Sequence, residues 1–427
     1  MGGGRLVVPL APPQRRHRPS PWTRVSHRSS FLHLVALATL CASTLALCAL
    51  LGTTSGPTRL GQRVVSARAG VGGSGAAVRA GYLEKLVDAA PSTVKVSPGS
   101  KFSVIIEPRV DSGREFLGRF LSENEDWVRN LLQSKGAVLI RGFDVPTAKD
   151  FNNVLPMQLG SDTKKGLLFD IIYKTIIASV FTLFRDLGNI DPGRRMDMGA
   201  GGRIQVLAPP SDCIQGPHQE SLTLATRLSQ RYIAFHCETQ PQTRGETAIF
   251  DTHAAYEDLD DDLRRLLTTH CWNFRDVNGK PTNDLIPCVV AHDDHQKPCI
   301  QVYAFGEMGE MAAEVAREVL DRDNLQPDPY LYGVTSFTLR NKETGAEREM
   351  TMDERRRLMK ALYKSSELCA WRKNDILLLD NVSVAHGRMD GRGPRKINFC
   401  GICDYLFDIN KYPSVRDDSS VELTARA

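Results

Sequence analysis

Apolar residues recur at helical spacing in several segments of the chain. Residues 114–133 predict one amphipathic helix, whose apolar stripe consists of Phe116, Phe120, Trp127, Leu131 and Leu132. Residues 254–268 predict a second helix, because their acidic residues come early and their Arg residues late, as the helix dipole prefers. We expect further helices at residues 309–321 and 353–370.

Short apolar runs bounded by glycine or polar residues predict strands. They lie at residues 136–142, 231–237, 375–380 and 396–406. Strands and helices do not alternate regularly, which argues against a Rossmann fold and a TIM barrel. We therefore expect one domain over residues 84–427, with an antiparallel core and flanking helices.

Two apolar stretches raise the question of a membrane span. Residues 31–51 are an uncharged run of 21 residues, long enough to cross a bilayer as a helix, although His33 and several hydroxyl residues weaken it. Residues 161–186 are interrupted by Asp170 and Lys174, so a buried helix is the better interpretation. Its role stays open between a substrate lid, an interface and additional core.

The charges divide the chain into two parts. Residues 1–83 hold ten Arg, no Lys and no acidic residue, so they carry +10. Because the whole chain carries +4, residues 84–427 carry −6. An acidic body has no electrostatic basis for binding nucleic acid. An acid-free segment rich in Arg and Ser is typical of a targeting leader.

The leader indicates an organelle as the destination. An apolar core followed by a stretch rich in Arg, Gly and Ser favours a plastid leader made of a signal sequence and a transit peptide. A single-pass anchor at residues 31–51 is the alternative, with the N-terminus in the cytoplasm. Mitochondrial import fits less well, because the apolar core is long for it. The chain would then meet a membrane only through the leader.

The ten cysteines show no evenly spaced disulfide framework, which fits a reducing compartment. Cys400 and Cys403 form a lone CxxC inside the apolar pattern of a strand. We expect them to be buried packing thiols.

The first chemical signal is His218-Gln219-Glu220. Residues two apart on an extended strand project from the same face, so this imidazole and this carboxylate can hold one metal ion. His386, just after the strand at 375–380, is the candidate third ligand. Two His and one carboxylate on one face leave three positions open, as in the facial triad of non-heme Fe(II) oxygenases. Alone the pair is a weak signal, and a surface or capping role for His218 is the alternative.

Four segments along the chain strengthen this interpretation. In chain order they are GAVLIRGF, PHQE, RGETAIFD and WRKNDILLLDNVSVAHGR. Together they resemble, across residues 113–410, the taurine dioxygenase and clavaminate synthase-like family of Fe(II)/2-oxoglutarate dioxygenases. The resemblance implies a double-stranded β-helix, a jelly-roll core of mainly β structure with flanking helices. It also implies Fe(II) as the metal, 2-oxoglutarate as the cosubstrate and O₂ as the oxidant.

Carried over residue by residue, the resemblance assigns five residues. The implied iron ligands are His218, Glu220 and His386, and the residues implied to hold the distal carboxylate of 2-oxoglutarate are Thr247 and Arg395. An Arg fork matches a carboxylate and keeps its charge. Arg392 is the alternative to Arg395. Two departures stand out: Arg244 replaces the first Gly of the family's Gly-Gly pair, and residues 161–186 have no counterpart.

The implied reaction is hydroxylation of an unactivated C–H bond in a small amino-acid-like or acid substrate, with release of succinate and CO₂. Desaturation, ring closure, a non-catalytic jelly-roll binding module and a zinc hydrolase are alternatives, while the presence of Glu220 argues against halogenation. A competing ligand pattern, His292 to His295, is expected to be a hairpin turn. We expect His253 and His270 at helix ends or in the core.

Overall fold

The computed structural model describes residues 87, 89–155, 213–220, 231–275, 279–281, 285–292, 296–329 and 336–401, and the backbone of 196–197 and 204–206. They belong to one compact unit within Gly73–Ala427. The predicted leader, the apolar stretch at 161–186, His295 and Cys403 lie outside the described residues. The plastid leader, the anchor at 31–51 and the boundary at residue 83 therefore stay predictions.

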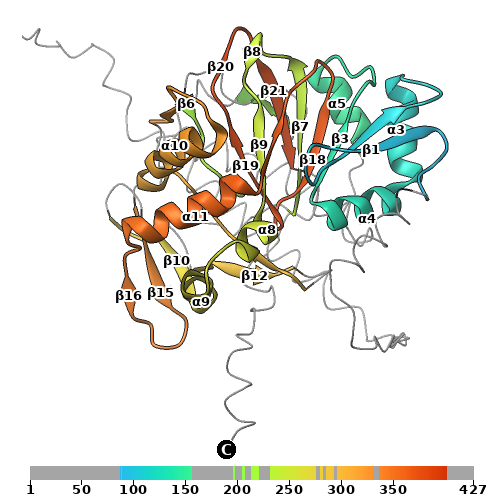
Figure 1. The fold of residues 1–427 in the computed structure, drawn as a ribbon. Helices are drawn as coiled ribbons and strands as arrows, with labels where there is room; N and C mark the ends of the chain where they lie inside the picture. The colour runs from blue at the N-terminus through green and yellow to red at the C-terminus, as the bar shows by residue number, and fades with distance from the viewer. Residues whose placement is uncertain are drawn as a thin grey trace, which may run out of the picture. The chain divides into compact units, whose positions relative to one another are not determined.

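An eight-stranded sheet forms the larger β layer (Figure 1). Its strands lie in the order β1 (Val94–Pro98), β2 (Val104–Pro108), β3 (Ala137–Ile140), β18 (Ile376–Asp380), β7 (Tyr232–Thr239), β21 (Lys396–Gly401), β5 (Ile204–Val206) and β4 (Met196–Asp197). Every pairing is antiparallel except that of β2 with β3. The continuous apolar run of β18 is explained by burial on both faces, since Ile376 and Leu378 pack on one side and Leu377 and Leu379 on the other.

A three-stranded antiparallel sheet faces the larger one. It consists of β17 (Ser366–Cys369), β9 (Thr247–Asp251) and β19 (Val384–Arg388), with β9 in the middle. Ile249, Cys369 and Val384 from this sheet share one buried cluster with apolar residues of β3, β7, β18 and β21. The two sheets therefore enclose a common core, and the fold is the expected double-stranded β-helix.

The remaining described strands form one four-stranded sheet and three two-stranded pairs. They are the sheet β11 (Ile286–Pro287), β10 (His270–Arg275), β15 (Ser336–Asn341) and β16 (Glu347–Arg348), and the pairs β12 (Val289–Ala291) with β13 (Pro298–Ile300), β14 (Gln326–Pro327) with β6 (Cys213–Ile214), and β20 (Gly391–Arg392) with β8 (Thr243–Arg244). The β12–β13 pair confirms the hairpin predicted around residue 292.

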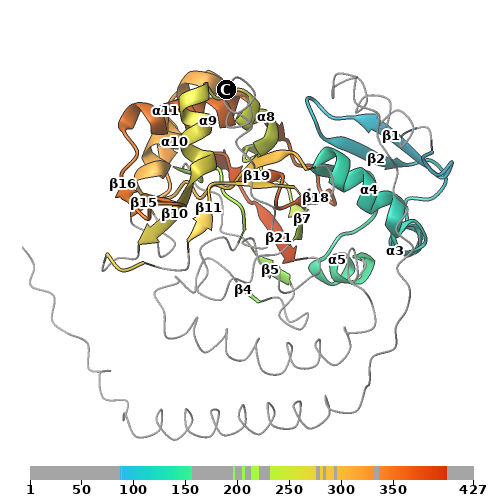
Figure 2. The same cartoon turned by 90° about the horizontal axis from the view of Figure 1, so that it is seen from below.

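Helices cover the outer faces of both sheets (Figures 1 and 2). The outer face of the large sheet packs against α3 (Arg114–Glu123), α4 (Glu125–Lys135) and α5 (Ala148–Val154). The outer face of the small sheet packs against α8 (Thr252–Glu257), α9 (Asp261–Thr269), α10 (Glu307–Leu320) and α11 (Met352–Lys364). Among the described residues, none of the helices combines the length and the apolar composition needed to cross a bilayer.

Three predicted helices were wrong in extent. The helix expected at 114–133 is divided at Asn124, whose side-chain Nδ2 and backbone N–H both donate to the carbonyl of Phe120, at 2.9 and 3.0 Å. The helix expected at 254–268 is divided before Asp260, whose carboxylate accepts from the backbone N–H of Leu263. Asn124 thus caps the end of α3, and Asp260 caps the start of α9, because short polar side chains compete for the backbone groups at helix ends.

The third difference lies at the end of α11. The helix was expected to run to residue 370, but it ends at Lys364, and Ser366–Cys369 pair with β9 as strand β17. Leu368 and Cys369 bury their side chains on opposite faces of this strand, toward the helices and toward the other sheet. Tertiary packing therefore overrides the helical pattern here.

Candidate metal centre

His218 and His386 are joined directly through their backbones. The N–H of each residue donates to the carbonyl of the other at 2.9 Å, which makes an antiparallel bridge between β19 and the segment before it. Their imidazole rings lie 4.3 Å apart between centroids. His386 shares the inward face of β19 with Val384, so the pair lies between the two sheets.

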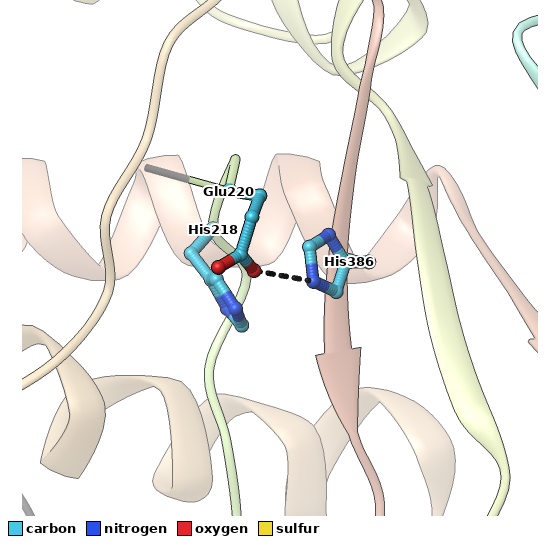
Figure 3. A group of neighbouring side chains, drawn as sticks. All are labelled: His218, Glu220 and His386. Atoms are coloured by element: carbon cyan, nitrogen blue, oxygen red, sulfur yellow. Dashed lines mark ion pairs between the residues drawn. The ribbon is translucent and has the colours of Figure 1, made fainter. Parts of the chain in front are cut away.

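Glu220 completes a group of three buried side chains (Figure 3). Its Oε2 atom lies 3.7 Å from Nε2 of His386. One candidate ligand atom from each of His218, Glu220 and His386 lies within 4.8 Å of the others. The structure thus brings together the three ligands that the sequence suggested, although Glu220 lies in a turn and not on the expected strand.

The chemistry of these atoms fits a divalent metal ion. Nδ1 of His218 lies 2.9 Å from the carbonyl of Gly216, which can only accept, so Nδ1 carries the proton and Nε2 presents a lone pair. Two imidazoles and one carboxylate form the donor set of the two-His, one-carboxylate site. All three ligand residues are at least nine-tenths buried.

Two amides that the sequence analysis did not assign hold this segment in place. Gln219 donates through Nε2 to the carbonyl of Ile300 at 2.9 Å and accepts at Oε1 from the N–H of Val302 at 2.7 Å. Asn381 accepts from the N–H of Glu220 at 2.9 Å and donates to its carbonyl at 3.1 Å. In the sequence, Asn381 belongs to the Asp-Asn pair of the segment WRKNDILLLDNVSVAHGR that carries the family resemblance, but nothing there indicated its contact with Glu220.

Arg395 is buried beside the turn that leads into β9. Its Nε donates to the carbonyl of Gly245 at 3.2 Å, while its NH1 atom has no hydrogen-bond partner among the residues that the structure describes. Burial, followed by the like charge of Arg388, lowers the pKa of Arg395 to about 9. A buried cation without an anion is costly, so the surroundings favour binding of an anionic group there.

Thr247 lies at the end of the same turn. Nε1 of Trp371 donates to Oγ1 of Thr247 at 3.1 Å, so the hydroxyl hydrogen can be donated to another group. Arg392, the alternative to Arg395, is exposed on β20. The geometry therefore fits Arg395 with Thr247 as the carboxylate anchor.

The unusual Arg244 is accommodated without a change in the turn. Its φ of 55° and that of Gly245, 73°, lie in the left-handed region that glycine adopts most easily. Its guanidinium binds the carboxylate of Asp390 at 2.8 Å. The backbone at this turn thus keeps a conformation typical of Gly-Gly.

The competing histidines have other surroundings. Nε2 of His292 lies 2.9 Å from Asp380 Oδ2 and 2.8 Å from Arg231 NH2, in a fully buried cluster. Nδ1 of His253 contacts the carbonyl of Pro298 and Nδ1 of His270 that of Leu266. Within the described part of the chain, His218, Glu220 and His386 are the only group of three side chains able to share a metal ion.

The sequence of this chain is similar to known proteins. The sequence profile of the taurine catabolism dioxygenase TauD, TfdA family matches residues 114–400, which is more than half of the chain. A clavaminate synthase-like protein of Arabidopsis thaliana is 21% identical over 304 residues, covering 65% of this chain and 84% of the relative.

Two solved structures show similarity at low sequence identity. PvcB, an Fe, alpha-ketoglutarate dependent oxygenase from an isonitrile synthetic pathway, is 17% identical, with a TM-score of 0.46, and the match covers 74% of this chain and 93% of PvcB. AAD-2 in complex with Mn(II) and N-oxalylglycine is 13% identical, with a TM-score of 0.43, and the match covers 76% of this chain and 100% of AAD-2.

Proposed function

The chain belongs to the TauD, TfdA family and is an Fe(II)- and 2-oxoglutarate-dependent dioxygenase, and we propose that its reaction is hydroxylation. The substrate we propose is a small amino-acid-like or acidic molecule with an unactivated C–H bond. Oxidation of that bond would accompany conversion of 2-oxoglutarate to succinate and CO₂. The family match and the buried His-Glu-His group support this proposal.

His218, Glu220 and His386 are the residues that we propose to hold the iron. They offer three donor atoms within 4.8 Å of one another, and a two-His, one-carboxylate set would leave coordination positions open for cosubstrate and oxidant. The iron, once bound, supplies the activation of O₂ that no protein side chain can provide. The protein supplies the geometry, because the bridge between His218 and His386 fixes two of the donors before any metal binds.

Arg395 and Thr247 are the residues that we propose to bind the distal carboxylate of 2-oxoglutarate. Arg395 binds the carbonyl of Gly245, two residues before Thr247, and within the described part of the chain its NH1 atom has no hydrogen-bond partner. A charge-assisted bond to a carboxylate would also compensate the buried charge of Arg395. Two observations together carry the proposal furthest: the buried His-Glu-His group, and a buried Arg395 whose NH1 atom finds no hydrogen-bond partner among the described residues. A zinc hydrolase has no need of the second.

Aromatic rings form the wall around the donors. The ring centroid of Phe305 lies 4.8 Å from that of His218, and the centroid of Phe235 lies 5.0 Å from that of His386. Such a wall excludes water from the ligand side chains and strengthens electrostatic interactions there. Desaturation and ring closure would use the same residues, and product analysis separates them from hydroxylation.

Anaerobic titration with Fe(II) and 2-oxoglutarate tests the proposal before a substrate is known. The wild-type chain should develop a weak visible charge-transfer band. His218→Ala, Glu220→Ala and His386→Ala should each lose this band and the succinate formed once O₂ is admitted. His253→Ala is the matched control, because the His253 ring contacts the Pro298 carbonyl and is not part of the His-Glu-His group, so this variant should keep the band. Wild-type activity in two of the three ligand variants would refute the assignment.

A further inference from the structure

Glu220 is the one proposed ligand that no helix or strand holds. His386 lies on β19 and His218 is fixed to it by two backbone bonds, whereas Glu220 lies in the turn that follows. A carboxylate on such a backbone has more freedom than an imidazole on a strand. Something other than secondary structure must therefore determine where the Glu220 carboxylate lies.

Asn381 provides that restraint. Its carboxamide accepts from the Glu220 N–H at 2.9 Å and donates to the Glu220 carbonyl at 3.1 Å. One acceptor and one donor side by side reproduce what a neighbouring strand would offer to the same residue. Asn381 is almost fully buried, so water does not compete for these bonds.

Asn381 is itself rigidly placed. Its N–H donates to the carbonyl of Arg231 at 2.9 Å. The preceding carboxylate of Asp380 accepts from the N–H of Val382 at 3.0 Å and from NH2 of Arg231 at 3.0 Å, and contacts Nε2 of His292. The buried cluster around His292 thus supports the turn that carries Asn381.

We propose that Asn381 is a positioning residue for the metal centre, which holds the backbone of Glu220 so that its carboxylate meets the same metal ion as His218 and His386. This inference rests on the proposed function. Asn381 itself touches neither the metal nor the cosubstrate in this arrangement. Loss of its amide should weaken metal binding before it affects anything else at the site.

The test compares the binding of Co(II) alone to the metal-free chain and its variants. Asn381→Ala removes both bonds and should weaken Co(II) binding about 10- to 100-fold, the range found for residues that orient metal ligands. Asn381→Ser keeps a hydroxyl, which can donate and accept, but on a shorter side chain that does not match the two-atom geometry of the carboxamide, so its affinity should lie between those of Ala and Asn. The visible absorption of bound Co(II) should also change, because it reports the ligand arrangement and not the stability of the fold.

Asn398 provides a matched control. It is as buried as Asn381 and binds Nδ1 of His236 and the carboxylate of Glu238. Its neighbours Phe399 and Cys400 pack on opposite faces of β21, with Cys400 among the outer helices, so Asn398 faces those helices and not the metal. Asn398→Ala and Asn398→Ser should lower thermal stability but leave Co(II) affinity within about twofold of the wild type, well inside the effect expected for Asn381.

The outcomes separate the inference from the proposed function. If the wild type binds no Co(II), or if His386→Ala binds it equally well, the proposed metal site fails and the inference with it. If the wild type binds Co(II) through His386 while folded Asn381→Ala matches it in affinity and spectrum, only the inference fails. Should Asn381→Ala not fold, Asn381→Ser decides between the same two results.

Discussion

At the scale of single residues, we expect the charge of Arg395 to set the affinity for 2-oxoglutarate. Its loss should weaken 2-oxoglutarate binding by about 2–5 kcal/mol, because a buried charge pair is removed. This corresponds to roughly a 30- to several-thousand-fold rise in the apparent dissociation constant. Arg395→Lys should restore only part of the affinity, since an ammonium is a point donor without the planar fork.

Thr247 and Arg392 complete this series. Thr247→Val should weaken the binding free energy of 2-oxoglutarate by about 1–3 kcal/mol, because one hydrogen bond from the hydroxyl to the carboxylate is lost. Arg392→Ala should have little effect, since Arg392 is exposed. The measurement is titration of the anaerobic charge-transfer band with 2-oxoglutarate. A large effect at Arg392 with none at Arg395 would move the anchor to Arg392 and leave the family assignment intact.

Residue types and their order predicted which side chains form the candidate site, but not the residues that hold those side chains in place. His218, Glu220 and His386 could be proposed because the chemistry of a metal limits which side chains bind it. Asn381 could not, because its partner Glu220 is 161 residues away, and the contact of Trp371 with Thr247 spans 124 residues. A hydrogen bond between residues far apart in the chain leaves no periodic signal in the sequence.

At the scale of elements, Glu367 joins the connection between β1 and β2 to strand β17. Its carboxylate accepts from the backbone N–H groups of residues 100–103 and from the hydroxyl of Ser103. Burial alone would raise the pKa of Glu367, but these hydrogen bonds hold it below its ordinary value. The loop therefore depends on an ionised carboxylate.

Glu367→Gln should destabilise the chain by about 1–3 kcal/mol, because an amide NH₂ would then face backbone donors. Stability from this group is fully present above the unfolded carboxyl pKa and is lost as the pH falls through the lower folded value. Urea unfolding at pH 7 measures the change. Glu343→Gln, at an exposed turn, should stay within about 0.5 kcal/mol of the wild type. Equal effects of the two substitutions would contradict the role of Glu367.

Elements were predictable where burial sets the pattern and unpredictable where a cap or a partner strand does. Strands β7 and β18 followed from continuous apolar runs. The break at Asn124 and the change from α11 to β17 did not, since one depends on a side-chain cap and the other on pairing with β9. The local pattern of apolar residues indicates which positions are buried, but it does not indicate with which distant strand a segment pairs.

At the scale of the whole molecule, buried neutral histidines couple stability to pH. Burial lowers the pKa of both His236 and His253. The unfolded chain therefore binds protons below about pH 6.5 that the folded chain does not, so stability falls as the pH drops below that value. Each such imidazole changes the free energy of unfolding by at most about 1.4 kcal/mol per pH unit.

Urea unfolding of the metal-free chain between pH 5 and 7.5 measures this dependence. His236→Phe is the informative variant, because it keeps an aromatic ring against Phe151 while removing the titrating group. The variant should be less stable at pH 7.5, since the bond from His236 to the carbonyl of Val145 is lost, but its stability should depend less on pH. An unchanged slope would show that His236 does not carry the effect.

We also expect the basic leader and the acidic remainder of the chain to differ in their association with membranes. Without residues 1–83, the protein should remain in the soluble fraction, since the remainder carries −6 and the apolar run at 31–51 is removed. Fractionation after a high-salt wash measures this. Persistent association with membranes would mean that the leader is not the only membrane element, and residues 161–186 would then need another interpretation.

The backbone bridge between His218 and His386 has a consequence for what happens to the chain when it loses its metal ion. The entropy of closing the long loop between these residues is lost when the chain folds, and not when iron binds. Metal then adds stability only by mass action, about 2.7 kcal/mol at a free concentration 100 times its dissociation constant. A chelator should remove that increment and leave the far-ultraviolet circular dichroism unchanged. We therefore expect that iron lost from the proposed ligands can be replaced in the folded chain, so that adding Fe(II) after chelation restores activity.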